Sequence, residues 1–310
     1  MSSHAASGPL RSAWSLARRL SAHRTSPFQR VAGPFQFTEG PVWDGAHILF
    51  TDIPSNRIIQ HDPATLACRV LRSDTCGANG LTCDRHGRLY ACEQTARRVV
   101  RYEPKGGVTT IAEQFQGRCL NSPNDVIVDS LGCVWFSDPR YGNRRADMEL
   151  DHESVFRLEG AGDGSSELVR VTFDTTRPNG LALSPDERTL YVAESPQAPE
   201  GRRQLRAYPV RPDRTLGEMT ILHDFGPHRG IDGVRVDAEG HVVAACGWRR
   251  SGAGPRVAVF TSAGDLLEEY AIPVEPTNVC FGGADLSDLY VTAYDGGLWR
   301  AKTGRRGLAW

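Results

Sequence analysis

The sequence of 310 residues has little lysine and no long apolar stretch. Only two of its 36 basic residues are lysines, Lys105 and Lys302. An arginine bias could serve phosphate or carboxylate recognition, although codon usage in a GC-rich genome is the explanation we favour. No run approaches the roughly 18 apolar residues of a membrane-spanning helix. With a formal net charge of −1, the chain has no bulk field for nucleic acid or an anionic membrane, so we expect neither as a partner.

Several catalytic and cofactor motifs are also absent. The sequence has no G-x-S-x-G nucleophile elbow, no H-E-x-x-H metal helix and no glycine-rich phosphate-binding loop, which argues against serine hydrolases, zincins and nucleotide enzymes. Its eight cysteines form no C-x-x-C pair and have no histidines at zinc-finger spacing. Because several of them, such as Cys83 and Cys133, fall within apolar strand patterns, we expect reduced thiols in a cytoplasmic protein rather than disulfides.

The first 38 residues contain no Asp or Glu and are rich in arginine. Ala13, Leu16 and Leu20 recur at helical spacing, with Arg11 and Arg18 on the opposite face. Such a segment resembles an organelle-import peptide. We favour a cytoplasmic N-terminal extension over residues 1–29, either disordered or with one short helix.

Six segments of the chain repeat one pattern of short strands. Each begins with an amide or carboxylate residue and continues through a strand and a turn to a second strand, as in Glu39-Gly-Pro-Val-Trp followed by Ile48-Leu-Phe-Thr-Asp. The six starts are 40, 45, 55, 53 and 46 residues apart. Strand repeats of this length are typical of propeller blades, each of which needs its neighbours to bury both faces. We therefore predict an all-β, six-bladed β-propeller over residues 30–304, followed by a tail at 305–310.

The sixth repeat is too short to complete a blade. Few residues follow Gly297, so we expect residues 30–37 to supply its outer strand, joining the N-terminal strand to the last blade. Two stacked β-sandwiches are the alternative, but they would not explain one motif recurring through the whole chain.

The aligned repeats place six polar residues at one equivalent position. The innermost strand of a propeller blade faces the central axis, so these residues would form a ring. All six carry oxygen donors, which suits Ca²⁺ above all, with Mg²⁺ or Mn²⁺ possible. Asn or Asp before Gly is also common in turns, but six in register favour a metal site open to water and substrate. The six are Glu39, Asn79, Asn124, Asn179, Asp232 and Asn278.

Several short motifs also resemble those of a known enzyme family. They include Phe37-Thr-Glu-Gly-Pro-Val-Trp, Asn121-Ser-Pro-Asn-Asp-Val, Arg177-Pro-Asn-Gly-Leu-Ala and Gly230-Ile-Asp-Gly-Val, and the likeness covers about residues 30–302. These runs are similar to the gluconolactonase, senescence marker protein (regucalcin) and luciferin-regenerating enzyme family. The resemblance implies a six-bladed propeller that hydrolyses a small molecule at one divalent metal ion.

The resemblance also implies roles for individual residues. Glu39, Asn179 and Asp232 correspond to the family's metal ligands, and Asn124 to a residue that is a ligand in some members and a substrate contact in others. We expect Ca²⁺, with Mg²⁺, Mn²⁺, Zn²⁺ or Fe²⁺ possible. As a hypothesis for mechanism, the metal polarises the carbonyl of a sugar lactone and Asp232 activates the attacking water.

Three further residues are candidates for substrate binding. Ser122 stands where the animal lactonases of the family have an arginine, and Tyr141 lies in a run that resembles the family's substrate-side loop. Arg97 could hold substrate at the channel mouth, although a solvated or edge-strand arginine is the simpler interpretation. Tyr141 could equally pack against a blade edge.

The expected protein is a monomer or weak homo-oligomer acting on a small lactone within carbohydrate metabolism. Two alternatives stay open. The same site could act on an organophosphate or another ester, or the propeller could be a metal-binding scaffold without catalysis.

Overall fold

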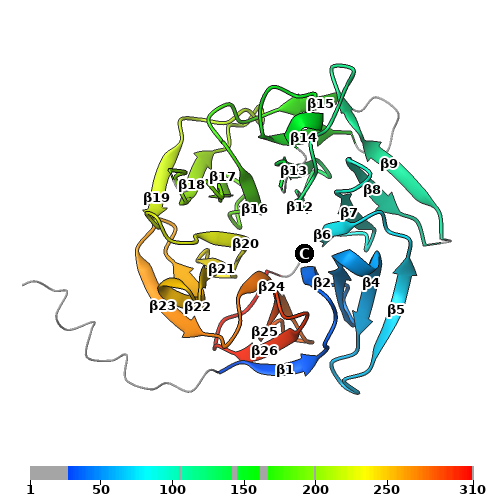
Figure 1. Ribbon diagram of the computed structural model, residues 1–310, viewed down its shortest axis with the longest axis vertical. Helices are drawn as coiled ribbons and strands as arrows, with labels where there is room; N and C mark the ends of the chain where they lie inside the picture. Colours follow the sequence, from blue (N-terminus) through cyan, green and yellow to red (C-terminus); the bar gives the residue numbers. More distant parts are fainter. Residues whose placement is uncertain (1–26, 105, 142–144, 161–166, 199, 309–310) are drawn as a thin grey trace, which may run out of the picture.

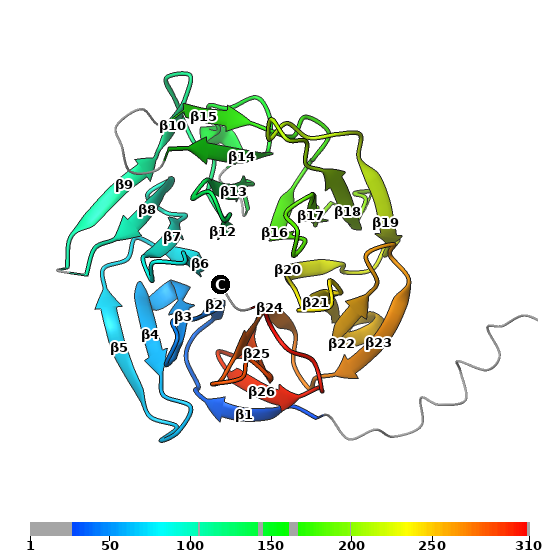
Figure 2. The same ribbon diagram turned by 180° about the vertical axis from the view of Figure 1, so that it is seen from behind.

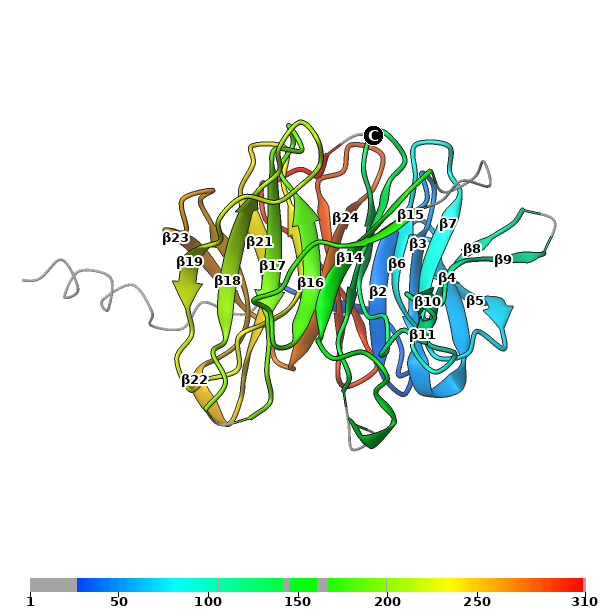
Figure 3. The same cartoon turned by 90° about the horizontal axis from the view of Figure 1, so that it is seen from above.

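The computed structural model describes residues 27–308, apart from 105, 142–144, 161–166 and 199. Within these residues, six four-stranded antiparallel sheets stand in a ring (Figure 1). The view from behind shows the same ring of six sheets (Figure 2), and the edge-on view shows the strands nearest the centre running along its axis (Figure 3). The predicted all-β, six-bladed β-propeller is confirmed.

In blades 1 to 5, the four strands follow one another along the chain from the centre outward, as short hairpin connections favour. In blade 6, the three inner strands do the same. Blade 1 contains β2 (Thr38–Trp43), β3 (Ile48–Asp52), β4 (Arg57–His61) and β5 (Cys68–Ser73). Blade 2 contains β6 (Ala78–Cys83), β7 (Leu89–Glu93), β8 (Arg98–Tyr102) and β9 (Val108–Ala112). Blade 3 contains β12 (Val126–Val128), β13 (Val134–Asp138), β14 (Ser154–Glu159) and β15 (Glu167–Arg170).

The remaining three blades follow the same order. Blade 4 contains β16 (Pro178–Leu183), β17 (Thr189–Glu194), β18 (Gln204–Pro209) and β19 (Thr220–Asp224). Blade 5 contains β20 (Ile231–Val236), β21 (Val242–Trp248), β22 (Ser251–Phe260) and β23 (Leu266–Ala271). Blade 6 contains β24 (Pro276–Gly282), β25 (Asp288–Ala293), β26 (Leu298–Lys302) and β1 (Gln29–Ala32). A short hairpin, β10 (Gln114–Phe115) and β11 (Arg118–Cys119), and two 3₁₀ turns at Ile53–Ser55 and Arg145–Asp147 complete the described elements.

The outer strand of blade 6 comes from the other end of the chain. β1 pairs antiparallel with β26, with Gln29 opposite Arg300. The strand covers residues 29–32 rather than the expected 30–37, because Pro34 has no N–H to donate to a sheet ladder. The helix predicted near Leu16 lies outside the described residues.

The tail after β26 contacts two neighbouring blades, blade 6 and blade 5. Gly307 N–H donates to the carbonyl of Leu286 (2.9 Å), and Gly307 also forms an isolated bridge with Asp237 of blade 5. The part of the tail that the structure describes therefore connects blade 6 to blade 5.

The hydrophobic core is divided into clusters that lie between neighbouring blades. Tyr90 of blade 2 packs with Phe136 of blade 3, for example, and both are fully buried. Ile48 of blade 1 and Tyr290 of blade 6 share another cluster, so apolar contacts also join the first blade to the last. Each sheet buries its faces only against its neighbours, which explains why the motif must recur around a complete ring.

A β-bulge interrupts the inner strand of most blades at the aligned polar residues. The pairing register shifts between Glu39 and Val42 in β2 and between Pro178 and Leu181 in β16, and β6, β20 and β24 have comparable shifts. A bulge adds a residue to one strand and redirects its side chain. The Asn–Gly and Asp–Gly pairs are therefore features of strands and not of turns.

The glycine that follows a bulged polar residue lets neighbouring inner strands come close together. A Cβ on Gly80 would lie 2.6 Å from the carbonyl oxygen of Asn124 in the next blade. A Cβ on Gly180 would lie 2.6 Å from the carbonyl oxygen of Asp232. Only glycine permits this approach without moving a backbone, so the narrow centre of the ring depends on these positions.

Two further findings concern the chain as a whole. All eight cysteines are free, and Cys92, Cys246 and Cys280 are buried in the core, as expected for reduced thiols. The described part of the chain contains no helix with the length and apolarity needed to span a bilayer.

The Gly80→Ala variant should lose about 1–3 kcal/mol of unfolding free energy, because the added methyl group would clash with the backbone of blade 3. Urea denaturation followed by tryptophan fluorescence measures this loss. Gly107→Ala is the matched control, since a Cβ there meets only side-chain atoms of Glu103 at 3.7 Å, and it should change stability by no more than about 0.5 kcal/mol. Equal stabilities of the two variants would refute the close approach of the inner strands.

Candidate functional site

A cavity of about 660 Å³ opens at one end of the ring axis, where the inner strands begin. This volume is typical of small-molecule sites. Five of the six aligned residues line it, one from each of blades 1 to 5: Glu39, Asn79, Asn124, Asn179 and Asp232. The sixth, Asn278, is not part of the described lining, but its side-chain amide donates a hydrogen bond to the carboxylate of Glu39. The repeat alignment thus predicted a convergence of side chains that lie up to 193 residues apart in sequence.

Glu39 is a buried carboxylate without a cationic partner among the described residues. Its side chain is held by two N–H groups, which donate to Oε2 from Gly40 (2.6 Å) and from the amide of Asn278 (3.1 Å). Burial raises the pKa of Glu39 to about 8, and repulsion from Asp232 contributes to the shift. An ionised Glu39 therefore lacks compensating charge, which a bound cation would supply.

Asp232 is the second carboxylate of the cavity, and it is partly buried, with 15% of its side chain exposed. Oδ1 accepts a hydrogen bond from the amide of Asn179 (2.7 Å), and Oδ2 accepts one from the guanidinium of Arg229 (2.6 Å). Burial raises the pKa of Asp232, although the charge of Arg229 opposes this shift. Asp232 is therefore fixed in orientation by donors on both oxygens.

Arg229 was not predicted from the sequence. Its guanidinium also donates to the carbonyl oxygens of Gly247 (2.7 Å) and Pro276 (3.1 Å), and it packs over the rings of Tyr294 (5.1 Å) and Trp248 (5.8 Å). The residue lies in the loop before β20, where spacing does not determine the direction of a side chain. Its proximity to the Gly230-Ile-Asp motif was the only available signal.

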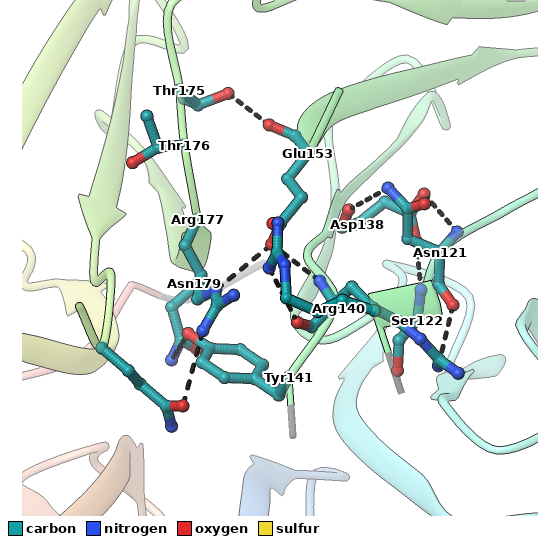
Figure 4. A network of polar contacts seen from close by, with 12 residues as sticks. Asn121, Ser122, Asp138, Arg140, Tyr141, Glu153, Thr175, Thr176, Arg177 and Asn179 are labelled. Carbon is teal, nitrogen blue, oxygen red and sulfur yellow. Dashed lines mark hydrogen bonds and ion pairs between the residues drawn. The ribbon is translucent and has the colours of Figure 1, made fainter. Parts of the chain in front are cut away.

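Asn179 and Tyr141 contact each other at the edge of the cavity (Figure 4). The side-chain nitrogen of Asn179 donates to the Tyr141 hydroxyl (2.8 Å) as well as to Asp232. The guanidinium of Arg177 lies over the Tyr141 ring at 5.1 Å. Because its amide nitrogen is committed to these two partners, the carbonyl oxygen is the side-chain atom of Asn179 that remains for a ligand. Tyr141 lines the cavity, as a substrate contact must.

Ser122 belongs to a polar network beside the cavity rather than to its described lining (Figure 4). The carboxylate of Asp138 accepts hydrogen bonds from the backbone N–H groups of Asn121 (2.8 Å) and Ser122 (2.7 Å). Burial raises the pKa of Asp138 to about 7. The Ser122 hydroxyl donates to the carbonyl of Gln94 (3.3 Å), so its contacts are with the protein scaffold.

Arg97, for which a place at the channel mouth was the less favoured interpretation of the sequence, is also absent from the described lining. Its guanidinium donates to the carbonyl oxygens of Leu120 (2.5 Å) and Asp147 (3.2 Å) and lies 3.6 Å from the carboxylate of Glu149. These contacts tie blade 2 to the segments that precede and follow β13. Through these contacts, Arg97 joins blade 2 to blade 3.

The residues that line the cavity offer side-chain oxygens that suit a hard divalent cation. Glu39 Oε1, Asn124 Oδ1 and Asn179 Oδ1 have no hydrogen-bond partner among the described residues, and Asn79 Oδ1 is buried without one. Ca²⁺ takes carboxylate and amide oxygens. The described residues contain no cluster of three or more His, Cys, Asp or Glu side chains suited to a metal. A site here must therefore combine the two carboxylates with amides.

Comparison with known proteins identifies the family. The model for the SMP-30/Gluconolactonase/LRE-like region matches residues 37–295. The chain belongs to this family. The membership expected from the motifs is thus confirmed.

Three members of the SMP-30/gluconolactonase/LRE-like family illustrate the similarity. The chain is 28% identical to the gluconolactonase of Zymomonas mobilis, with 83% of this chain and 76% of the relative aligned. It is 31% identical to the pentonolactonase XacC of Haloferax volcanii, with 83% and 81% aligned. The solved structure of a gluconolactonase from Xanthomonas campestris is 33% identical, with a TM-score of 0.78 over 89% of this chain and 88% of that one.

Replacing Glu39 by Gln should raise the unfolding free energy of the metal-free protein at pH 9. The folded-state pKa of about 8 lies above the ordinary value of 4.5, so ionising Glu39 disfavours folding. This penalty is absent below about pH 4.5, grows as the pH rises to 8 and is constant above it. We expect an advantage of at least ~1 kcal/mol for the variant at pH 9, which disappears toward pH 4.5.

Urea denaturation in EDTA at several pH values measures this difference. Glu218→Gln is the control, because Glu218 is exposed and should show no such pH dependence. A Glu39→Gln protein that is less stable than the wild type at every pH would contradict the assignment of an uncompensated carboxylate.

Proposed function

We propose that this protein hydrolyses the ester bond of a small sugar lactone in the axial cavity, using one divalent cation, with Ca²⁺ preferred. Glu39, Asn179 and Asp232 would hold the cation, and Asn124 would complete its shell or bind the substrate. The observation that carries the proposal is the convergence of a buried carboxylate, a partly buried one and three amides in one cavity of substrate size. The named relatives, a gluconolactonase and a pentonolactonase, support a lactone as the substrate.

The lining of the cavity suits a polyhydroxylated ring. Amide side chains from blades 2 and 4, namely Asn79, Gln94 and Gln197, can donate to and accept from sugar hydroxyls. The Tyr141 hydroxyl accepts a hydrogen bond from Asn179, so its own hydrogen is available to a substrate oxygen. Apolar surface from Ile53 and the ring of Trp248 can cover the carbon skeleton.

A bound cation would supply Lewis-acid polarisation of the lactone carbonyl. Asp232 would take a proton from the attacking water, whose oxygen forms a bond to the carbonyl carbon. The raised pKa makes this carboxylate a stronger base than one in free solution. Arg229 and Asn179 hold it in place. When the ring C–O bond breaks, Asp232 would return the proton to the leaving alkoxide, which gives an open-chain hydroxy acid.

Chelation should abolish hydrolysis of D-glucono-1,5-lactone above its spontaneous rate, and Ca²⁺ should restore it. A pH-stat assay at fixed pH, with separate additions of Ca²⁺, Mg²⁺, Mn²⁺, Zn²⁺ and Fe²⁺ and a panel of aldonolactones, measures this. Undiminished activity in EDTA would exclude the metal. If no lactone in the panel were opened with any of the cations, the proposed function would be wrong.

Asp232→Asn should lower kcat by about 10²–10⁴-fold, since the amide cannot accept the proton from water. The substitution preserves shape, and Asn can still accept the hydrogen bond from Arg229, so the fold should persist. Asp285→Asn is the matched control, because Asp285 lies in an exposed turn of blade 6 and should leave kcat unchanged. Near-normal turnover by the Asp232 variant would be incompatible with its role as the base.

A further inference from the structure

Three arginines lie on one side of the axial cavity. Arg203 immediately precedes β18, Arg229 precedes β20, and Arg250 lies in the turn between β21 and β22, so all three come from blades 4 and 5. The described lining contains two carboxylates, Glu39 and Asp232, and thus has an excess of positive charge even before a cation binds.

Two of the three arginines have no carboxylate partner among the described residues. Among the described residues, Arg203 donates to three backbone carbonyl oxygens, of Gly201 (3.0 Å), Ala198 (2.8 Å) and Gln197 (3.4 Å), and to no side chain. Arg250 is exposed to the cavity and has neither a hydrogen bond nor an ion pair with any described residue. The adjacent Arg249, by contrast, forms a 2.7 Å ion pair with Glu275. The charges of Arg203 and Arg250, which line the cavity, therefore have no carboxylate partner among the described residues, whereas the charge of Arg249 is neutralised by Glu275.

The opposite side of the cavity is uncharged apart from Glu39. Blades 1 and 2 contribute Phe37, Ile53, Pro54, Asn79 and Gln94 to the lining. Arg229 is already engaged by Asp232, so the charge available to a ligand is that of Arg203 and Arg250. The cavity is thus polarised, with its free positive charge away from the Glu39 side.

We propose that the natural substrate is a lactone with a second, anionic group, which Arg250 binds with support from Arg203. This inference rests on the proposed lactone hydrolysis and specifies its substrate class. A guanidinium presents a planar set of donors that matches the oxygens of a carboxylate, a phosphate or a sulfonate. An uncharged lactone would leave both guanidinium groups without a counter-ion. The anionic group would lie on the side of blades 4 and 5, remote from Glu39.

The test compares anionic with uncharged lactones of similar size. D-glucono-1,5-lactone is the uncharged substrate, and its 6-phosphate, its 6-sulfonate and a monolactone of glucaric acid are the anionic ones. The wild type should prefer at least one anionic lactone by about tenfold in kcat/KM, mainly through a lower KM. The most favoured of the three identifies the anionic group as phosphate, sulfonate or carboxylate.

Arg250→Gln should reduce this preference about tenfold by removing a charge-assisted contact. Arg69→Gln makes the same change of formal charge on β5, an exposed outer strand, and should retain the preference. The preference of the wild type should also weaken as salt is added, because Arg250 is exposed. Equal kcat/KM for charged and uncharged lactones, or equal preferences in the two variants, would overturn the inference.

A binding measurement separates this inference from the proposed function. Isothermal titration calorimetry with D-glucitol 6-phosphate, D-glucarate and uncharged D-glucitol requires no hydrolysis. Tighter binding of an anion that depends on Arg250, with no lactone opened, would refute lactone hydrolysis and retain the anionic ligand class. Efficient opening of uncharged lactones, with no advantage for any anion in either assay, would retain the hydrolase and refute the anionic class.

Discussion

The burial of Glu39 beside a second carboxylate, without a cationic partner among the described residues, is the constraint on which the rest of the site depends. Glu39 and Asp232 face the same cavity, and burial raises the pKa of both. Arg229 compensates Asp232, while the partners of Glu39 in the described part of the chain are two N–H donors. An ionised Glu39 disfavours folding unless a positive charge binds next to it, so its presence is more easily explained by a function than by stability.

The architecture of the ring explains how the pair is brought together. In five of the six blades, a bulge of the inner strand redirects a polar side chain, and the glycines beside these bulges allow neighbouring strands to approach. Apolar clusters between blades hold this arrangement in place. The centre of the ring combines polar groups with oxygens that lack protein partners, and the outer strands only support it. The functional chemistry therefore belongs to the aligned positions, and the arginines of blades 4 and 5 add the selectivity we propose.

The resemblance of a few short motifs was sufficient to predict the family. The repeat pattern was sufficient to predict the number of blades and the ring of amides and carboxylates. Those features follow from spacing along the chain, because each repeat forms one blade and equivalent residues of the repeats therefore lie at equivalent places around the axis. Arg97, Ser122 and Arg229 show where such reasoning ends, because all three lie outside the repeated strand positions. The direction of a loop side chain depends on carbonyl groups and rings from distant segments, as the contacts of Arg229 with Gly247 and Tyr294 illustrate.

The most direct test of the central claim is an X-ray structure of the protein crystallised with Ca²⁺. The account predicts one strong density peak in the axial cavity, with oxygens of Glu39, Asn179 and Asp232 at about 2.3–2.6 Å from it. A structure with Ca²⁺ bound only elsewhere, or with these side chains turned away from a common centre, would contradict it.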